Sequence, residues 1–144
     1  MNEFNKQIRL LYSKWSKLKP LKFIIVTTIL SLILMIPIAL VIDLLNVGEV
    51  EIGGLNTEKY SYLGLFVLVV IAAPLIETIV FQLFPIKLIQ KLLNNRFNLF
   101  PILISSILFS LAHYVYSVWY SLLILPLGFL LAQTYLIFQK RKES

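Results

Sequence analysis

Long apolar runs separated by short polar segments make up most of the chain. Residues 23–42 carry no charged side chain, residues 61–86 carry only Glu77, and residues 97–139 carry no formal charge apart from the titratable His113. About 20 apolar residues are enough for a helix to cross a bilayer. The first two runs therefore predict one transmembrane helix each, and the third is long enough for two.

The first 22 residues differ from the rest because their apolar and basic positions recur with a helical period. The apolar face consists of Ile8, Leu11, Tyr12, Trp15 and Leu18, and the basic face of Lys6, Arg9, Lys14, Lys17 and Lys19. Such a helix typically lies in the surface of an anionic membrane; a disordered basic tail is the alternative. We predict an all-α polytopic membrane protein, with a basic amphipathic cytoplasmic segment that forms an interfacial helix over residues 1–22. A single transmembrane domain of about four helices follows over residues 23–144.

Positive charges predict the orientation of these spans. Six Lys and Arg lie in residues 1–22, three in residues 87–96 and three in residues 140–142. With a cytoplasmic N-terminus, these twelve of the thirteen basic residues lie inside, and so do both termini. The acidic loop at residues 48–60 then lies outside. An interfacial aromatic belt is expected at the last outer turn, made of Tyr114, Tyr116, Trp119 and Tyr120.

Composition narrows the function classes further. Hydrophobic residues make up 59% of the chain and charged residues 14%, which leaves too little polar surface for a soluble domain. Because topology accounts for the net charge of +6, we expect a bilayer with an anionic inner leaflet as partner and no nucleic acid. Cysteine is absent, which excludes disulfides, thiolate metal sites and a cysteine nucleophile.

Two ionisable residues lie inside the apolar runs, where a charge costs a few kcal/mol or more and normally faces the bundle interior or water. Glu77 and His113 are each eighteen residues from Asn95, the centre of the expected turn between their helices. An antiparallel hairpin would therefore bring them to a similar depth. Phe81 and Phe109 each lie four residues away, on the same helical faces as Glu77 and His113.

Together a carboxylate and an imidazole can activate a water molecule for attack on a peptide carbonyl. An interhelical hydrogen bond that ties two spans together is the structural alternative. Thr78 and Gln82 form a second polar row beside Glu77. Two groups are too few for a transition metal, which usually has three protein ligands, so no metal and no cofactor is expected.

These residues carry a family resemblance. Residues 73–82, APLIETIVFQ, resemble the first motif of the CPBP intramembrane proteases, Pro-x-x-Glu-Glu-x-x-Phe-Arg. These are membrane proteins of CAAX processing and bacteriocin immunity. Residues 105–113, SSILFSLAH, are similar to the second motif, Phe-x-x-x-His, and residues 126–130 resemble the glycine-containing start of the next helix. The resemblance covers about residues 60–138.

By this resemblance the chain is a short, divergent member, and Glu77 and His113 are its catalytic, water-activating pair. Thr78, Gln82, Phe81 and Phe109 would position the substrate. The family's second Glu is Thr78 here and its Arg is Gln82. A further family helix with His-x-x-x-Asn or Asp has no counterpart, since the chain contains one histidine. Losing one oxyanion donor commonly costs ~100- to 1000-fold in rate, so we expect slow proteolysis or none unless Gln82, Tyr114 or a partner chain supplies a donor.

Three functions remain open at this point. The first is a CPBP-like intramembrane endopeptidase, a hydrolase acting on a membrane-embedded peptide or protein. The second is a non-catalytic relative that binds a partner, for example in bacteriocin immunity. The third is an accessory subunit of a membrane complex. In each case we expect an integral protein of a bacterial cell membrane.

Overall fold

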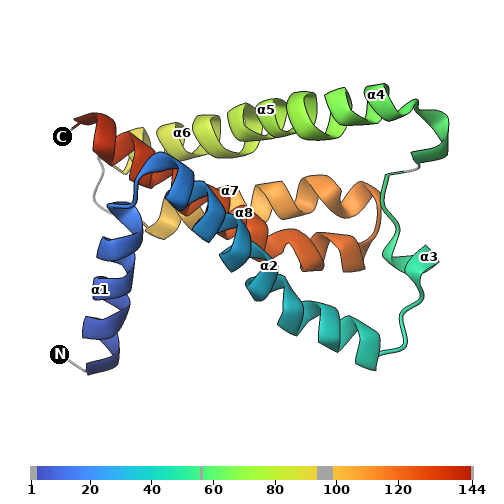
Figure 1. Ribbon diagram of the computed structural model, residues 1–144, viewed down its shortest axis with the longest axis horizontal. Coiled ribbons are helices and arrows are strands. Elements are labelled where there is room, and N and C mark those ends of the chain that lie inside the picture. The colour runs from blue at the N-terminus through green and yellow to red at the C-terminus, as the bar shows by residue number, and fades with distance from the viewer. Residues whose placement is uncertain (1–2, 56, 94–98, 144) are drawn as a thin grey trace.

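The computed structural model describes residues 3–55, 57–93 and 99–143, and every regular element in these residues is helical (Figure 1). The longer helices are α1 (Glu3–Ser16), α2 (Pro20–Leu44), α7 (Leu99–Ala112) and α8 (Val118–Glu143). The short elements are α3 (Glu49–Ile52) and the 3₁₀ turns Thr57–Lys59 and His113–Val115. One continuous helix consists of α4 (Tyr62–Leu65), α5 (Ala73–Glu77) and α6 (Phe84–Leu92), joined by the π-helical turns Phe66–Ala72 and Thr78–Leu83. The predicted all-α fold class is thus confirmed.

Three helices are long and apolar enough to cross a membrane: Pro20–Leu44, Tyr62–Leu92 and Val118–Lys142. A fourth apolar helix, Leu99–Val115, is shorter. These four segments coincide with the predicted spans. The chain is therefore a polytopic helical membrane protein, and its fourth apolar helix is shorter than the roughly 20 residues that span a bilayer.

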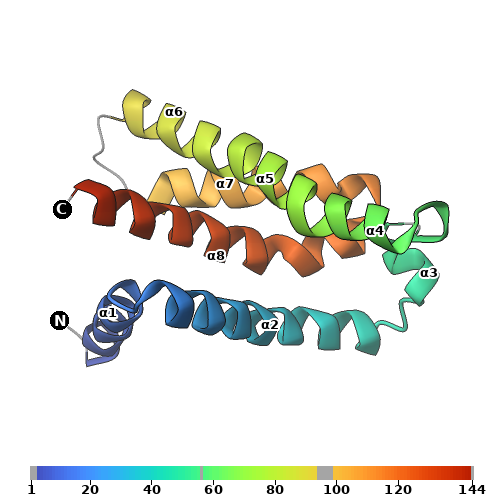
Figure 2. The ribbon, with the colours of Figure 1, turned by 45° about the horizontal axis from the view of Figure 1, so that its top comes forward.

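The helices run roughly along one axis and form a bundle (Figure 2). α7 and α8 make the most extensive contact, α2 packs on α8, and α6 packs on α7. Both described ends of the chain lie at one end of the bundle, whereas α3 and the turn between α7 and α8 lie at the other (Figures 1 and 2). The bundle thus has a terminal end and an opposite end, which is here called the α3 end.

The core lies where α6, α7 and α8 meet. Ile86, Ile102, Ala132 and Leu136 form a fully buried cluster, with Phe129 packed against it. Outside this core most of the large apolar side chains on α2 and on the Tyr62–Leu92 helix are exposed. So large an apolar surface would aggregate in water, but it is the surface that a bilayer solvates.

Each of the two π-helical turns in the Tyr62–Leu92 helix is followed closely by a proline. Pro74 follows the turn Phe66–Ala72, and Pro85 follows the turn Thr78–Leu83. A proline has no N–H, and its ring crowds the carbonyl four residues earlier, so a local π turn relieves the helix. The short α5 between the two turns ends at Glu77.

The predicted N-terminal helix is present as α1, but it ends at Ser16 and not at residue 22, because the chain turns and α2 begins at Pro20. α1 crosses the terminal end of the bundle at a steep angle to α2 (Figure 1). The Trp15 ring stacks on Phe23 with centroids 5.3 Å apart, and Trp15 Nε1 donates a hydrogen bond to Thr27 Oγ1 at 3.0 Å. A helix lying in a membrane surface would cross its bundle in this way. Its location at the cytoplasmic surface stays a prediction.

Candidate functional site

Glu77 and His113 lie next to each other, as the sequence predicts. The Nε2 atom of His113 is 3.5 Å from Oε1 of Glu77. Glu77 comes from the end of α5, and His113 begins the 3₁₀ turn after α7. Their side chains are 29% and 14% exposed, respectively, so a small molecule can reach them although neither faces open surroundings. The turn around Asn95, from which the pairing was predicted, lies outside the described residues.

The end of α7 fixes the orientation of the imidazole. His113 Nδ1 is 2.8 Å from the backbone carbonyl oxygen of Phe109. A carbonyl oxygen only accepts hydrogen bonds, so Nδ1 must carry a proton and donate it. Nε2 is then the nitrogen that can act as a base, and it is the atom that faces Glu77. The Phe109 carbonyl thereby sets the tautomer.

A cavity of about 310 Å³ adjoins the pair. Its lining residues are Leu55, Leu68, Val69, Ala73, Glu77, Phe109, His113, Tyr116, Tyr120, Ile124 and Leu127. The walls are mostly aliphatic or aromatic, and the polar side chains come from four residues only. This is the usual composition of a ligand site, in which a few polar groups fix the position of an apolar ligand.

Tyr116 and Tyr120 share this cavity with His113. The His113 ring lies 6.2 Å from the Tyr116 ring and 5.9 Å from the Tyr120 ring, and the two tyrosine rings are 5.3 Å apart. The sequence interpretation placed both tyrosines in an interfacial aromatic belt and missed this role. Tyr116 and Tyr120 follow His113 by three and seven residues, but the turn between α7 and α8 separates Tyr120 from His113, so helical spacing alone could not have identified them.

The loop before α4 closes the cavity at the α3 end of the bundle. The Ser117 hydroxyl donates a hydrogen bond to the backbone carbonyl of Ile52 at 2.5 Å. Gly53, whose φ is +72°, packs against the Tyr116 carbonyl, and a Cβ at Gly53 would lie 3.0 Å from that oxygen. These contacts hold the loop in place, so that Leu55 reaches the cavity wall.

Gln82 is buried between the π turn and α7 and does not line the cavity. Its side-chain oxygen accepts a hydrogen bond from the Ser105 hydroxyl at 3.1 Å, and its Nε2 has no partner among the described residues. The same hydroxyl also contacts the Phe81 carbonyl, which Pro85 leaves without its helical donor. Ser105 therefore compensates for the proline and connects the two helices that carry Glu77 and His113.

The other predicted positioning residues lie at different distances from the cavity. Phe109 is buried, lines the cavity and has its ring 4.8 Å from the His113 ring. Phe81 stands behind it, edge to face at 6.2 Å. Thr78 is exposed, and its hydroxyl donates to the Pro74 carbonyl at 2.6 Å. Tyr114 is 60% exposed and does not line the cavity. Whether Thr78, Gln82, Phe81 and Phe109 position a substrate stays a prediction.

Within the described residues no group of three or more His, Cys, Asp and Glu side chains could hold a metal ion. The chemistry available at this site is that of one carboxylate, one imidazole and two phenols. Together they define a helical membrane protein with an acid–base pair at an apolar cavity.

Comparison with known families agrees with that description. The family model of type II CAAX prenyl endopeptidase Rce1-like proteins matches residues 59–141, which is more than half of the chain and includes both residues of the pair. The protein belongs to this Rce1-like family, as the resemblance to CPBP intramembrane proteases predicted. Searches of curated proteins and of solved structures gave no match.

Proposed function

We propose that this protein is an intramembrane endopeptidase of the CAAX type, in which Glu77 and His113 activate the attacking water. The observation that supports the proposal is the 3.5 Å approach of the two side chains at the wall of a cavity, inside the part of the chain that matches the family. A pair that only tied two helices together would not need a cavity beside it.

The proposed first step follows from the tautomer of His113. With its proton on Nδ1, His113 Nε2 accepts hydrogen bonds, and so does an ionised Glu77. A water oxygen about 2.8 Å from both atoms would donate one proton to each and direct its lone pairs into the cavity. When that oxygen attacks the peptide carbonyl carbon, a C–O bond forms, the water proton moves to Glu77, and the carbonyl electrons move to oxygen. General-base catalysis of this kind contributes about 100- to 10,000-fold in rate.

The second step cleaves the peptide bond. The oxyanion electrons re-form the carbonyl, the C–N bond breaks, and Glu77 returns its proton to the leaving nitrogen. The products are a carboxylic acid and an amine. We assign the stabilisation of the oxyanion to the hydroxyl groups of Tyr116 and Tyr120, because the side chains that line the cavity include no other neutral hydrogen-bond donor besides His113.

The substrate is proposed to be an apolar peptide segment reached from the α3 end of the bundle. Glu77 lies at the middle of the Tyr62–Leu92 helix, and the cavity extends from there to Leu55 in the loop near α3. The basic residues predict that this end lies outside the cytoplasm. The family name makes a CAAX-type end with a prenyl group the first substrate to test, since a prenyl chain suits aliphatic walls.

Cleavage by the purified, detergent-solubilised protein tests the proposal. The probes are a quenched fluorescent peptide ending in a farnesylated CAAX sequence and the same peptide without the farnesyl group. We expect Glu77→Gln to lower the cleavage rate about 100-fold or more, because an amide cannot take a proton from water. His113→Ala should do the same, and the double variant should lose little more, since both act on one water.

Glu51→Gln is the matched control, because it makes the same chemical change on an exposed residue outside the cavity. It should leave the rate unchanged. A Glu77→Gln protein that cleaves as fast as the parent would refute the catalytic role. Cleavage of neither peptide by the parent protein, at confirmed folding, would also count against the proposal. In that case a binding function that survives Glu77→Gln but not Phe109→Ala would be favoured.

A further inference from the structure

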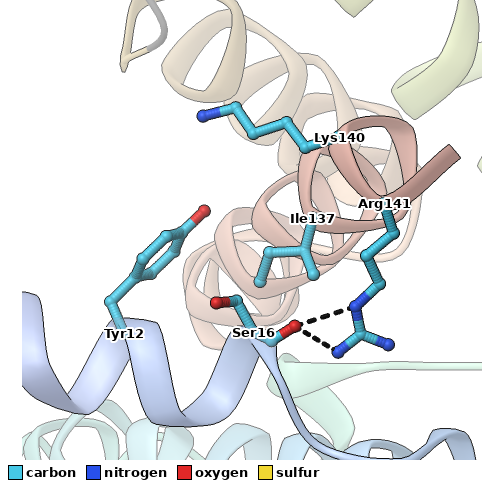
Figure 3. A pocket seen from close by; sticks show the side chains of 5 residues that line it. All are labelled: Tyr12, Ser16, Ile137, Lys140 and Arg141. Carbon is cyan, nitrogen blue, oxygen red and sulfur yellow. Dashed lines mark hydrogen bonds between the residues drawn. The ribbon is translucent and has the colours of Figure 1, made fainter. Parts of the chain in front are cut away.

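A second hollow lies at the terminal end of the bundle, between α1 and the end of α8 (Figure 3). It has a volume of about 280 Å³ and is lined by Tyr12, Ser16, Ile137, Lys140 and Arg141. In Figure 3 the Tyr12 hydroxyl and the Lys140 side chain extend into the same space above Ile137. The polar groups are thus a phenol, a serine hydroxyl and two cations, with no carboxylate in the lining.

Arg141 has a fixed position beside this pocket. Its Nε and Nη2 atoms donate to the Ser16 carbonyl at 2.8 and 2.5 Å, and Nη2 also donates to the Leu18 carbonyl at 3.0 Å. These carbonyls follow the end of α1, where the helix leaves acceptors without partners. The guanidinium carbon also lies 4.9 Å from the Phe23 ring centre and 5.3 Å from that of Phe138. Arg141 thereby joins α1, α2 and α8.

Lys140 and Tyr12 supply the groups that are available to a ligand in this pocket. Figure 3 shows the Arg141 guanidinium turned away from both, toward the Ser16 backbone, so Arg141 contributes its positive charge and holds the helices together. Lys140 is exposed and makes no ion pair within the described part of the chain. Burial raises the pKa of the Tyr12 phenol above its ordinary value, so its hydroxyl keeps a proton to donate at neutral pH. The pocket therefore suits an anionic oxygen group.

An apolar groove of about 480 Å³ adjoins the pocket between α1 and α2. Its lining includes Leu11, Trp15, Leu18, Val26 and Leu30, and Tyr12 lines both the groove and the pocket. A ligand that filled both would have an anionic head and a hydrocarbon chain. Free phosphate would use only the head.

We propose that the α1–α8 pocket and the adjoining groove bind one anionic phospholipid, with its phosphate at the Lys140 ammonium and the Tyr12 hydroxyl and an acyl chain along Trp15. The occupant is a lipid because the apolar groove continues the basic pocket, and because the helices that form both are those of a membrane protein. The site differs from a general attraction of α1 to charged membranes, since it requires the end of α8. Bound there, the lipid would hold α1 against the bundle.

Lipid-specific quenching of Trp15 fluorescence tests this proposal in the full-length protein. Trp119→Phe makes Trp15 the single tryptophan. The protein is reconstituted in phosphatidylcholine vesicles that contain an equal minor fraction of either brominated phosphatidylglycerol or brominated phosphatidylcholine. We expect stronger quenching by the phosphatidylglycerol. Lys140→Gln should lower this preference about fivefold, the usual effect of one basic residue at an anionic surface.

Lys142→Gln is the matched control, because Lys142 carries the same charge two residues away and does not line the pocket. It should lower the preference clearly less than Lys140→Gln does. Equal losses in Lys140→Gln and Lys142→Gln would show a diffuse charge effect and overturn the proposal, as would equal quenching by the two lipids in the parent. Inorganic phosphate should not reverse the quenching. If it does, the pocket binds a soluble anion and the lipid assignment is wrong.

Discussion

Adding a single methyl group at Gly128 should push α8 away from α7. A Cβ built on Gly128 would lie 2.8 Å from Cδ1 and 3.3 Å from Cβ of Phe109, and 3.2 Å from the Ser106 carbonyl oxygen. Carbon atoms in ordinary contact are about 3.5–4.0 Å apart. In the variant Gly128→Ala the Phe109 ring must therefore move by roughly 0.7 Å or more. The helices must also separate by a few tenths of an ångström, because the other two contacts are to parts of α7 that cannot rotate away.

Two opposing free energies decide the size of the effect. Inserting a methyl group into a packed interior typically costs about 1–3 kcal/mol. Replacing glycine by alanine in a helix gains up to about 1 kcal/mol. We expect a net destabilisation of about 1–2 kcal/mol. The effect on activity should be larger, since Phe109 both lines the cavity and accepts the hydrogen bond that orients His113. A displacement of about 1 Å at a reacting group can cost about 100-fold in rate.

Thermal unfolding in detergent and peptide cleavage measure the two effects. The control is Gly64→Ala, whose new Cβ would approach only the Ser61 side-chain oxygen, at 3.2 Å. Phe109→Leu in the Gly128→Ala background should recover part of the lost stability, so that the two changes cost less together than separately. A Gly128→Ala protein that unfolds at the parent's temperature and cleaves at the parent's rate would show that the close approach is not needed.

Three further outcomes are expected. A cysteine introduced as Asn95→Cys in the cysteine-free chain should be labelled only after the membrane is permeabilised, whereas Glu51→Cys should be labelled in intact cells; the reverse pattern would refute the proposed orientation. Ser105→Ala should lower the free energy of unfolding by about 1–3 kcal/mol, because it leaves buried acceptors without a donor. Gln82→Leu should keep stability close to the parent's, since it removes a buried amide nitrogen without a partner; a large loss of cleavage with normal stability would then assign Gln82 to the substrate.

The helices and the central pair of the site could be predicted from the sequence. Uncharged runs of span length leave few alternatives to helices, because a bilayer provides no partner for open backbone groups. Glu77 and His113 were recognisable since ionisable groups in apolar spans are costly and rarely without a partner. Their proximity could be predicted because both lie at equal sequence distances from the turn at Asn95. Counting residues therefore predicted that the two side chains lie at a similar level in the bundle.

Other parts of the site depended on contacts that counting does not show. Tyr116 and Tyr120 have the composition of an interfacial belt, and only the tight turn between α7 and α8 directs them toward His113. Thr78 and Gln82 are four residues apart, which in a regular helix would place them on one face. In the structure Thr78 is exposed and Gln82 is buried against Ser105. The π turn that begins at Thr78 rotates the side chains after Glu77 around the helix axis relative to a regular α-helix. A pattern based on 3.6 residues per turn cannot predict that rotation.

The prolines explain why that π turn lies beside the pair. Pro85 has no N–H, so the Phe81 carbonyl loses its usual helical donor. The Ser105 hydroxyl on α7 donates to this carbonyl instead. His113 Nδ1 donates to the Phe109 carbonyl at the end of α7. In both places a side chain hydrogen-bonds a backbone oxygen of a helix, and in both places that bond fixes the geometry of the site. The irregular backbone is thus part of how Glu77 and His113 are brought together, and a sequence that regularised it, with alanine for Pro85, should strengthen the helix while loosening its contact with α7.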